Sequence, residues 1–268
     1  EAWQMPQGLI ALQGQLGAMQ AQIETRLQRG TQTVQVQGRL SAASTNPRAG
    51  EWRGQIDNAS AQLSAPGHAT PWQAQLQKAM TWQLSSSSTG TTARWQAGQI
   101  GWQGPVPGQA RLQWDAGQWQ TKTPTPPRAH APRAAAPNTQ IAVRIDDLPL
   151  SWIPGGLGSE LQSDLLLKGH VKLEQNDALH LSAVLERSRG DLRINAENAP
   201  GQRLNAGLSE ARIQLQIDGE AVQAQLMWQS EQMGQAQAQL QTRLSHNDGG
   251  WTWAEQAPVS GWLKAQLP

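Results

Sequence analysis

The chain has 268 residues, of which 38% are hydrophobic and 15% are charged, and its net charge is +1. This composition excludes a chain that is disordered throughout, and it lacks the basic footprint of a nucleic-acid-binding protein. Cysteine is absent, which excludes disulfides and cysteine chemistry but fits either redox compartment. No signal peptide is recognisable and no apolar run approaches the roughly 18 residues of a transmembrane helix, so we expect a processed piece of a longer protein.

The first pattern along the chain, residues 9–28, fits two structures. Six apolar residues recur there at spacings of three and four: Leu9, Leu12, Leu16, Met19, Ile23 and Leu27. Such spacing is typical of a helix. Gly14 and Gly17 oppose a helix at roughly 1 kcal/mol each relative to Ala. Helix and strand therefore both stay open for this segment.

Strict alternation of apolar and polar residues, which is typical of half-buried strands, begins with TVQVQGRL at 33–40. It places Val34, Val36 and Leu40 on one face. Further on, SSSSTGTT at 85–92 predicts a disordered loop tip.

The first 120 residues are also rich in tryptophan. Seven residues make up this set: Trp52, Trp72, Trp82, Trp95, Trp102, Trp114 and Trp119. We interpret them as large core side chains whose indole N–H groups reach the solvent at the edge of the core. A platform on which sugars stack is the alternative.

Composition divides the chain into three parts. Residues 1–120 form a Trp-rich β segment, and 121–138 form a Pro/Ala-rich linker or loop without a period. Residues 139–268 form a second alternating β segment, which we expect to be continuous with the first.

The clearest hairpin lies in ARIQLQIDGEAVQAQLMWQ, residues 211–229. If Gly219 and Glu220 are the two loop residues, Gly219 takes the positive φ of a type II′ turn. That register pairs Ile217 with Val222, Leu215 with Ala224 and Ile213 with Leu226. It also sets Gln216 opposite Gln223 and Gln214 opposite Gln225, so the residue pattern and the turn support one another.

Other segments of the back half alternate in the same way, at 165–173, 179–186, 191–196 and 235–244. EQNDA at 174–178 and HNDGG at 246–250 are the next best turn signals. With a short turn at 174–178, His180 lies across from Lys172 on the polar face.

Candidate chemical sites are weak. Asp146 and Asp147 are strand neighbours and point to opposite faces, so a turn entry is the better interpretation. Asp164, Asp177 and Asp191 lie beside turn or Gly positions and are expected to be solvated. None of His68, His130, His170, His180 and His246 has the spacing of a metal pair, and GGLG at 155–158 lacks the strand and helix of a phosphate loop. We expect neither an enzyme nor a cofactor.

The back half resembles the middle region of TamB-family proteins, which belong to the AsmA-like group. The features that carry the resemblance are LPLSW at 148–152, the strand start Gly190, Asp191 and Leu192, AGLSEARIQLQ at 206–216, and APVSG followed by LKAQLP at the end. They lie within residues 95–268, and they are β-repeat signatures without a catalytic motif.

The resemblance implies an all-β fold, an elongated and mostly antiparallel sheet that is curled into a U-shaped trough with an apolar inner face. It implies a periplasmic protein, anchored to the inner membrane by a segment outside this chain, that conducts phospholipid between the two membranes and supports outer-membrane biogenesis. A TamA-like outer-membrane barrel is the partner that the family implies. The lipid groove would be lined by Leu165, Leu167, Val171, Leu173, Leu179, Leu181, Leu185, Ile213, Leu215, Ile217, Val222, Ala224, Leu226, Leu240 and Leu244.

Alternation alone does not distinguish a trough from a closed β-sandwich. Two other functions also stay open. One is a chaperone-like scaffold that offers an open sheet edge to outer-membrane strands, and the other is a secreted glycan-binding module that uses its Trp residues.

Overall fold

The computed structural model describes residues 3–15, 17–46, 50–64, 70–88, 90–105, 108–122, 138–153, 162–176, 178–195, 203–247, 250–253 and 256–267. Within those ranges almost every segment is a β-strand and no α-helix occurs; the one helical turn described, Leu150–Trp152, is of the 3-10 type. The chain divides into unit 1, Glu1–Val143, and unit 2, Arg144–Pro268. Residues 123–137 of the expected linker lie outside the described ranges.

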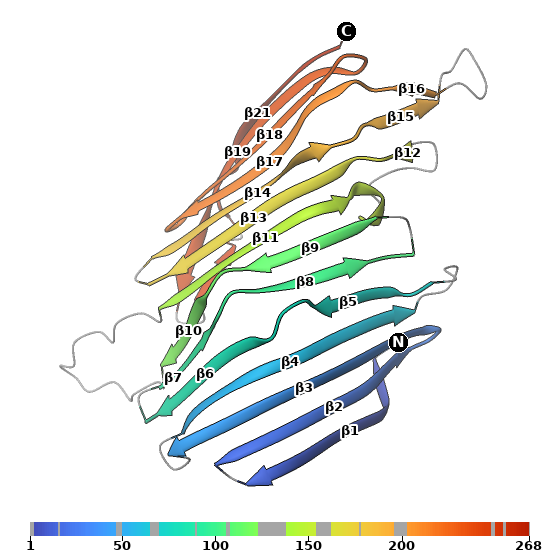
Figure 1. The fold of residues 1–268 in the computed structure, drawn as a ribbon. Coiled ribbons are helices and arrows are strands. Elements are labelled where there is room, and N and C mark those ends of the chain that lie inside the picture. Colours follow the sequence, from blue (N-terminus) through green and yellow to red (C-terminus); the bar gives the residue numbers. More distant parts are fainter. Residues whose placement is uncertain are drawn as a thin grey trace, which may run out of the picture. The chain divides into compact units, whose positions relative to one another are not determined.

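Unit 1 is an antiparallel sheet that forks (Figure 1). Its strands are β1 (Gln4–Gln15), β2 (Ala18–Arg29), β3 (Gln32–Asn46), β4 (Glu51–Ser64), β5 (Trp72–Leu76), β6 (Met80–Ser87), β7 (Gly90–Trp95), β8 (Gly98–Gln103), β9 (Gln109–Trp114) and β10 (Gly117–Lys122). The first four strands pair in sequence order. The two halves of β4 then pair with different strands, so that one branch continues as β5, β8 and β9 and the other as β6, β7 and β10.

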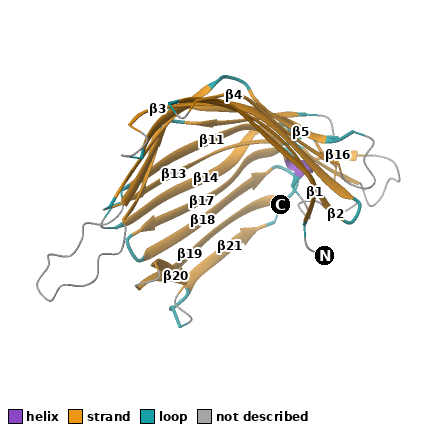
Figure 2. Ribbon diagram, turned by 90° about the horizontal axis from the view of Figure 1, so that it is seen from below, coloured by secondary structure: helices purple, strands orange, loops and turns teal. Residues whose placement is uncertain are grey.

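Unit 2 has one main sheet and one small sheet. β11 (Thr139–Pro149) crosses the boundary between the units. The main strands are β13 (Leu166–Gln175), β14 (Leu179–Arg189), β17 (Leu208–Asp218), β18 (Ala221–Ser230), β19 (Gly234–Asn247) and β21 (Ser260–Gln266), paired antiparallel in that order and side by side in Figure 2. The small sheet consists of β12 (Gln162–Ser163), β15 (Leu192–Asn195) and β16 (Arg203–Asn205), and β20 (Gly250–Trp253) pairs with the end of β19.

The predicted strand face of unit 1 is correct, and it carries all seven Trp residues of the front. The cross-strand pairs place all of these Trp residues on the same side of the sheet as Val34, Val36 and Leu40. We call this side the apolar face of unit 1 and the opposite side, which is rich in Gln and Arg, its polar face. Five of these Trp side chains are half-buried, whereas Trp102 and Trp119 are exposed.

Glycines explain how these Trp side chains pack. Gly54 lies opposite Trp82, Gly98 opposite Trp114, and Gly117 opposite Trp95. A Cβ at any of the three glycines would come within 3.0 Å of the ring of its partner. Each indole therefore lies over a neighbouring glycine, and the absent side chain is what makes room for it.

Residues 9–28 are two strands and not a helix. β1 and β2 form a hairpin in which Leu12 faces Ala21 and Ile10 faces Ile23. The predicted disordered tip at 85–92 is wrong, because β6 extends to Ser87 and β7 begins at Gly90. Its hydroxyls pair across the hairpin, with Ser86 Oγ 3.1 Å from Thr91 Oγ1, and such pairs stabilise a sheet.

Candidate functional site

The apolar face of unit 2 is the candidate site. Cross-strand pairs align its side chains in rows that run over six strands. One row consists of Val171, Ala183, Leu215, Ala224, Leu240 and Gly261. The next consists of Gly169, Leu185, Ile213, Leu226, Ala238 and Leu263. The hairpin register predicted for 211–229 is confirmed pair by pair, and Gly219 has the positive φ of 57° that the turn requires.

One end of this face is covered by β20. Leu179, Val222 and Leu244 are buried there, and Trp251 of β20 packs against them. Leu173, Leu215 and Ile217 add half-buried contacts to the same cluster. We call it the β20 cluster.

The other end is covered by the small sheet and by the turn at Leu150–Trp152. Leu165, Leu167, Leu192, Ala206 and Leu208 form a buried cluster in this region. Trp228, Leu185 and Leu150 pack around it. We call it the small-sheet cluster.

Between the two clusters an apolar band stays open. Val171 is 42% exposed, Ile213 52%, Leu240 43% and Leu263 69%. They come from β13, β17, β19 and β21, so the band crosses the width of the sheet. An aliphatic strip of this kind, left in contact with solvent between two packed ends, is typical of a surface that meets another apolar partner.

The predicted groove residues therefore fall into three groups. Covered in the clusters are Leu165, Leu167, Leu173, Leu179, Leu185, Leu215, Ile217, Val222 and Leu244. Exposed in the open band are Val171, Ile213 and Leu240. Half-buried on the same face are Leu181, Ala224 and Leu226. Leu263 also lies in the band. Sequence reasoning did not assign it to the groove, because the apolar residues of β21 point to both faces of the strand.

The polar face of unit 2 carries amide rows and ion pairs, and the buried side chain of Val184 lies in the row of Gln214. Gln214, Gln225 and Gln239 form one row, and Lys168 Nζ lies 3.2 Å from Glu186 Oε1 in another. The predicted position of His180 is wrong: it faces Glu174, not Lys172, and its Nδ1 lies 2.9 Å from Asp218 Oδ1. Because the loop between β13 and β14 spans 176–178, the pairing is shifted by two residues.

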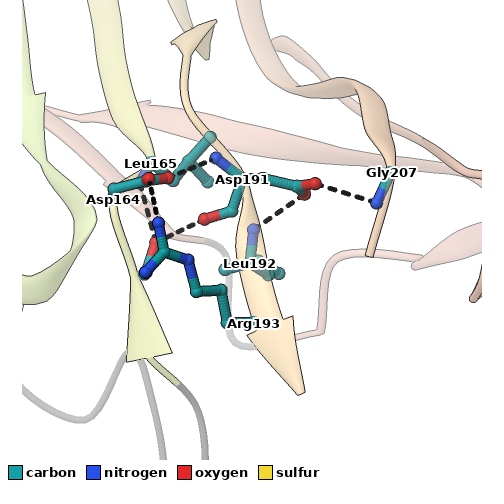
Figure 3. Close-up of polar contacts among 7 residues, drawn as sticks. Asp164, Leu165, Asp191, Leu192, Arg193 and Gly207 are labelled. Carbon is teal, nitrogen blue, oxygen red and sulfur yellow. Dashed lines mark hydrogen bonds and ion pairs between the residues drawn. The ribbon is translucent and has the colours of Figure 1, made fainter. Parts of the chain in front are cut away.

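The prediction that Asp191 is a solvated turn residue is wrong, because its carboxylate is the centre of a clasp of hydrogen bonds (Figure 3). Its carboxylate accepts hydrogen bonds from the amides of Leu192, Gly207 and Leu208 at 2.8, 2.9 and 3.0 Å. Its own amide donates to Asp164 Oδ1 at 2.7 Å, and Asp164 Oδ2 lies 2.9 Å from a guanidinium nitrogen of Arg193.

The clasp sits where strands pass from the main sheet into the small sheet. Gly190–Asp191 separates β14 from β15, and Ala206–Gly207 separates β16 from β17. Gly190 has a φ of 85°, and a Cβ there would collide with the backbone of Asp164. Asp191 thus links the two segments, Gly190–Asp191 and Ala206–Gly207, at which the chain leaves the main sheet for the small sheet. These breaks allow the small sheet to cover one end of the apolar face.

Hydrogen bonding decides the charge of Asp191. Partial burial raises its pKa, but the amides of Leu208, Leu192 and Gly207 and the charge of Arg187 together lower the pKa below its usual value. The carboxylate is therefore ionised at neutral pH, as three amide donors require.

The hollows outlined by the described residues include one of about 730 Å³ in unit 1, which lies between rows of polar side chains such as Gln13, Gln55 and Gln83. Within the described ranges no group of three or more His, Cys, Asp or Glu is placed to hold a metal ion. Over the same ranges no helix has the length and apolar character to cross a bilayer.

Comparison of the chain with protein-family models, with curated proteins and with solved structures found no match.

Proposed function

We propose that this chain is a lipid-binding segment of a TamB-like protein, in which the sheet curls into a trough and acyl chains lie along the apolar face of unit 2. The observation that carries the proposal is the open band of Val171, Ile213, Leu240 and Leu263, which is exposed between two covered ends. Each methylene of an acyl chain that leaves water against such a band gains about 0.8 kcal/mol.

The polar face supports the same proposal from the other side. Its Gln rows and ion pairs keep one side of the sheet in water, while the aliphatic side is offered to lipid. A periplasmic location, conduction of phospholipid between inner and outer membranes, and a TamA-like barrel partner belong to the proposal through the resemblance.

Photo-crosslinking at neighbouring positions tests lipid binding. We would place a photo-reactive residue at Ile213 and, separately, at Gln214, because strand neighbours point to opposite faces. Ile213 is the better probe than Leu215, since Ile213 is 52% exposed whereas Leu215 packs in the β20 cluster. We expect phospholipid to be captured at 213 and not at 214. Equal capture at both positions, or none at 213 together with no lipid in an organic extract of the purified chain, would contradict the proposal.

A second function, a scaffold for outer-membrane strands, is favoured by the sheet edges. Among the described pairings, β1 pairs only with β2 and β21 pairs only with β19, and every described residue of these two edge strands is exposed. Such edges can accept an extended peptide as an additional strand. Capture of β-strand peptides that is lost when Gln7 and Leu9 are changed to Pro, without loss of lipid at 213, would favour this function.

A further inference from the structure

Charge is divided unequally between the two units. Unit 1 contains 11 Lys and Arg residues against 5 Asp and Glu, a net charge of +6. Unit 2 contains 10 against 15, a net charge of −5. The overall charge of +1 hides this division, and a basic unit in a nearly neutral chain calls for an anionic partner.

Arg53 and Arg94 concentrate that positive charge in one row on the polar face of unit 1. Arg53 faces Gln83, and Gln83 faces Arg94. Two strand spacings, about 10 Å, therefore separate the two arginines across the sheet. In the part of the chain that the structure describes, no ion pair or hydrogen bond is formed by the side chain of either arginine, and both are exposed.

The arginine row is a ridge between two hollows. The hollow of about 730 Å³ runs over β1, β2, β3, β4 and β6 on one side, and one of about 280 Å³ runs over β3, β4, β6 and β7 on the other. Arg53, Gln83 and Ala43 line both. Both hollows thus cross the strands. Each strand contributes a polar side chain to the larger hollow, whereas β3 contributes only Ala43 to the smaller one.

The lining indicates the chemistry of the ligand. Gln13, Gln20, Gln55 and Gln83 present amides, each of which donates and accepts hydrogen bonds, beside the hydroxyls of Ser41 and Thr81. Such a wall suits a ligand that is rich in hydroxyl groups. The arginines supply planar forks that fit carboxylates, and Glu51 is the one acidic residue in the lining of the smaller hollow.

We propose that the polar face of unit 1 binds an acidic polysaccharide of the uronic-acid type, which lies across the strands with its carboxylates on Arg53 and Arg94. The strand spacing of about 4.8 Å is close to the length of one sugar ring in an extended chain, so successive sugars meet successive strands. This site is independent of the lipid proposal, because it uses the other unit and the polar face.

Calorimetric titration of the full chain tests the site. The probes are a hexagalacturonate, a neutral cellohexaose of similar length, poly-L-glutamate as a polyanion without sugar, and vesicles containing an anionic phospholipid. We expect hexagalacturonate to bind and the other three to bind at least about tenfold more weakly, because only the first presents carboxylates and hydroxyls together. Binding of poly-L-glutamate or of the vesicles as tight as that of hexagalacturonate would overturn the assignment, as would equally tight binding of cellohexaose.

Two matched pairs of substitutions locate the site. Arg53→Gln with Arg94→Gln removes two charges from the ridge, and Arg26→Gln with Arg111→Gln removes two charges from the same face in other rows. The first pair should raise the Kd of hexagalacturonate by at least about tenfold, since each arginine makes charge-assisted bonds, and the second should change it by less than about twofold. Ala43→Phe, which fills both hollows without a change of charge, should also weaken binding. Equal losses from the two pairs, or unchanged binding by Ala43→Phe in a chain with an unchanged circular dichroism spectrum, would show that no such site exists.

Discussion

The two units cover an apolar sheet face in different ways. In unit 1, Trp rings lie over glycines of the same sheet, as Trp114 does over Gly98. Unit 2 uses aliphatic side chains and covers the ends of its face with further elements, β20 and the small sheet. Because those elements reach only the ends, the middle band stays open in unit 2.

Charge follows the same division. Several ion pairs lie in unit 2, among them Lys168 with Glu186 and His180 with Asp218. Arg53 and Arg94 of unit 1 have no such partner within the described ranges. One alternating pattern has thus produced two surfaces, an open aliphatic band in one unit and an unpaired cationic ridge in the other.

The largest expected effect separates the covered and the open parts of the face of unit 2. Val222 is 3% exposed in the β20 cluster, so Val222→Arg buries an unpaired charge and should lower the free energy of unfolding by about 3–5 kcal/mol. Ile213→Arg on the same face should lower it by less than about 1 kcal/mol, because the long side chain reaches water. Chemical denaturation of both variants measures the difference, and equal losses would mean that the open band is packed.

Removing the clasp should cost less than that. Asp191→Ala leaves the amides of Leu192, Gly207 and Leu208 without their acceptor, and we expect a loss of about 3 kcal/mol in the free energy of unfolding. Protection of these amides against hydrogen exchange should fall with it. Retained protection would show that the small sheet is held by its apolar cluster alone.

The clasp also predicts a pH dependence. Because the pKa of Asp191 is lowered in the folded state, its contribution is present above the unfolded pKa of about 3.9 and is lost as the pH falls through the folded value. Asp191→Asn should therefore flatten the acid limb of the stability curve below about pH 4. Identical acid limbs for wild type and Asp191→Asn would contradict the prediction.

A smaller effect is expected from the Trp–Gly pairs of unit 1. A methyl group in Gly98→Ala would come within 2.2 Å of the ring of Trp114, so the ring must move, at a cost of about 2 kcal/mol. In Trp114→Ala the same methyl group should cost much less, and a double-mutant cycle measures the coupling. Additive losses would mean that the ring is not held over the glycine.

The sequence predicts strand pairing within a hairpin better than pairing between strands that are far apart in the chain. The pairing of 211–229 was predictable because a two-residue turn with Gly219 fixes the register of both strands. Residues 9–28 were ambiguous because a spacing of four, as in Met19, Ile23 and Leu27, satisfies a strand as well as a helix. Leu9 and Leu12 gave a false helical spacing, since they point to opposite faces of β1.

Pairing between distant strands was beyond prediction. Trp82 of β6 and Gly54 of β4 are 28 residues apart with β5 between them, and nothing local indicates that they meet. Asp191 joins Gly207 and Asp164 from other strands, so its sequence neighbours indicated only a turn. For the same reason the groove residues could be assigned to one face but not divided into covered and exposed members, because β20 and the small sheet decide that division.

The smallest expected effect concerns the charges. Glu186 lies 3.2 Å from Lys168 Nζ and 3.7 Å from Arg212 Nε, and the Arg212 Nε atom is buried without a hydrogen bond. Glu186→Gln should lower the free energy of unfolding by at most about 1 kcal/mol, because the Lys168 partner is half exposed and screened by solvent. Arg53→Gln in unit 1 removes a charge that has no partner in the described part of the chain, and it should leave stability unchanged at low salt. Denaturation at about 0.01 M and 1 M salt checks both, since screening should shrink only the effect at Glu186. A loss at Arg53 that grows at low salt would reveal an attractive partner for that arginine and would remove the difference in charge pairing between the two units.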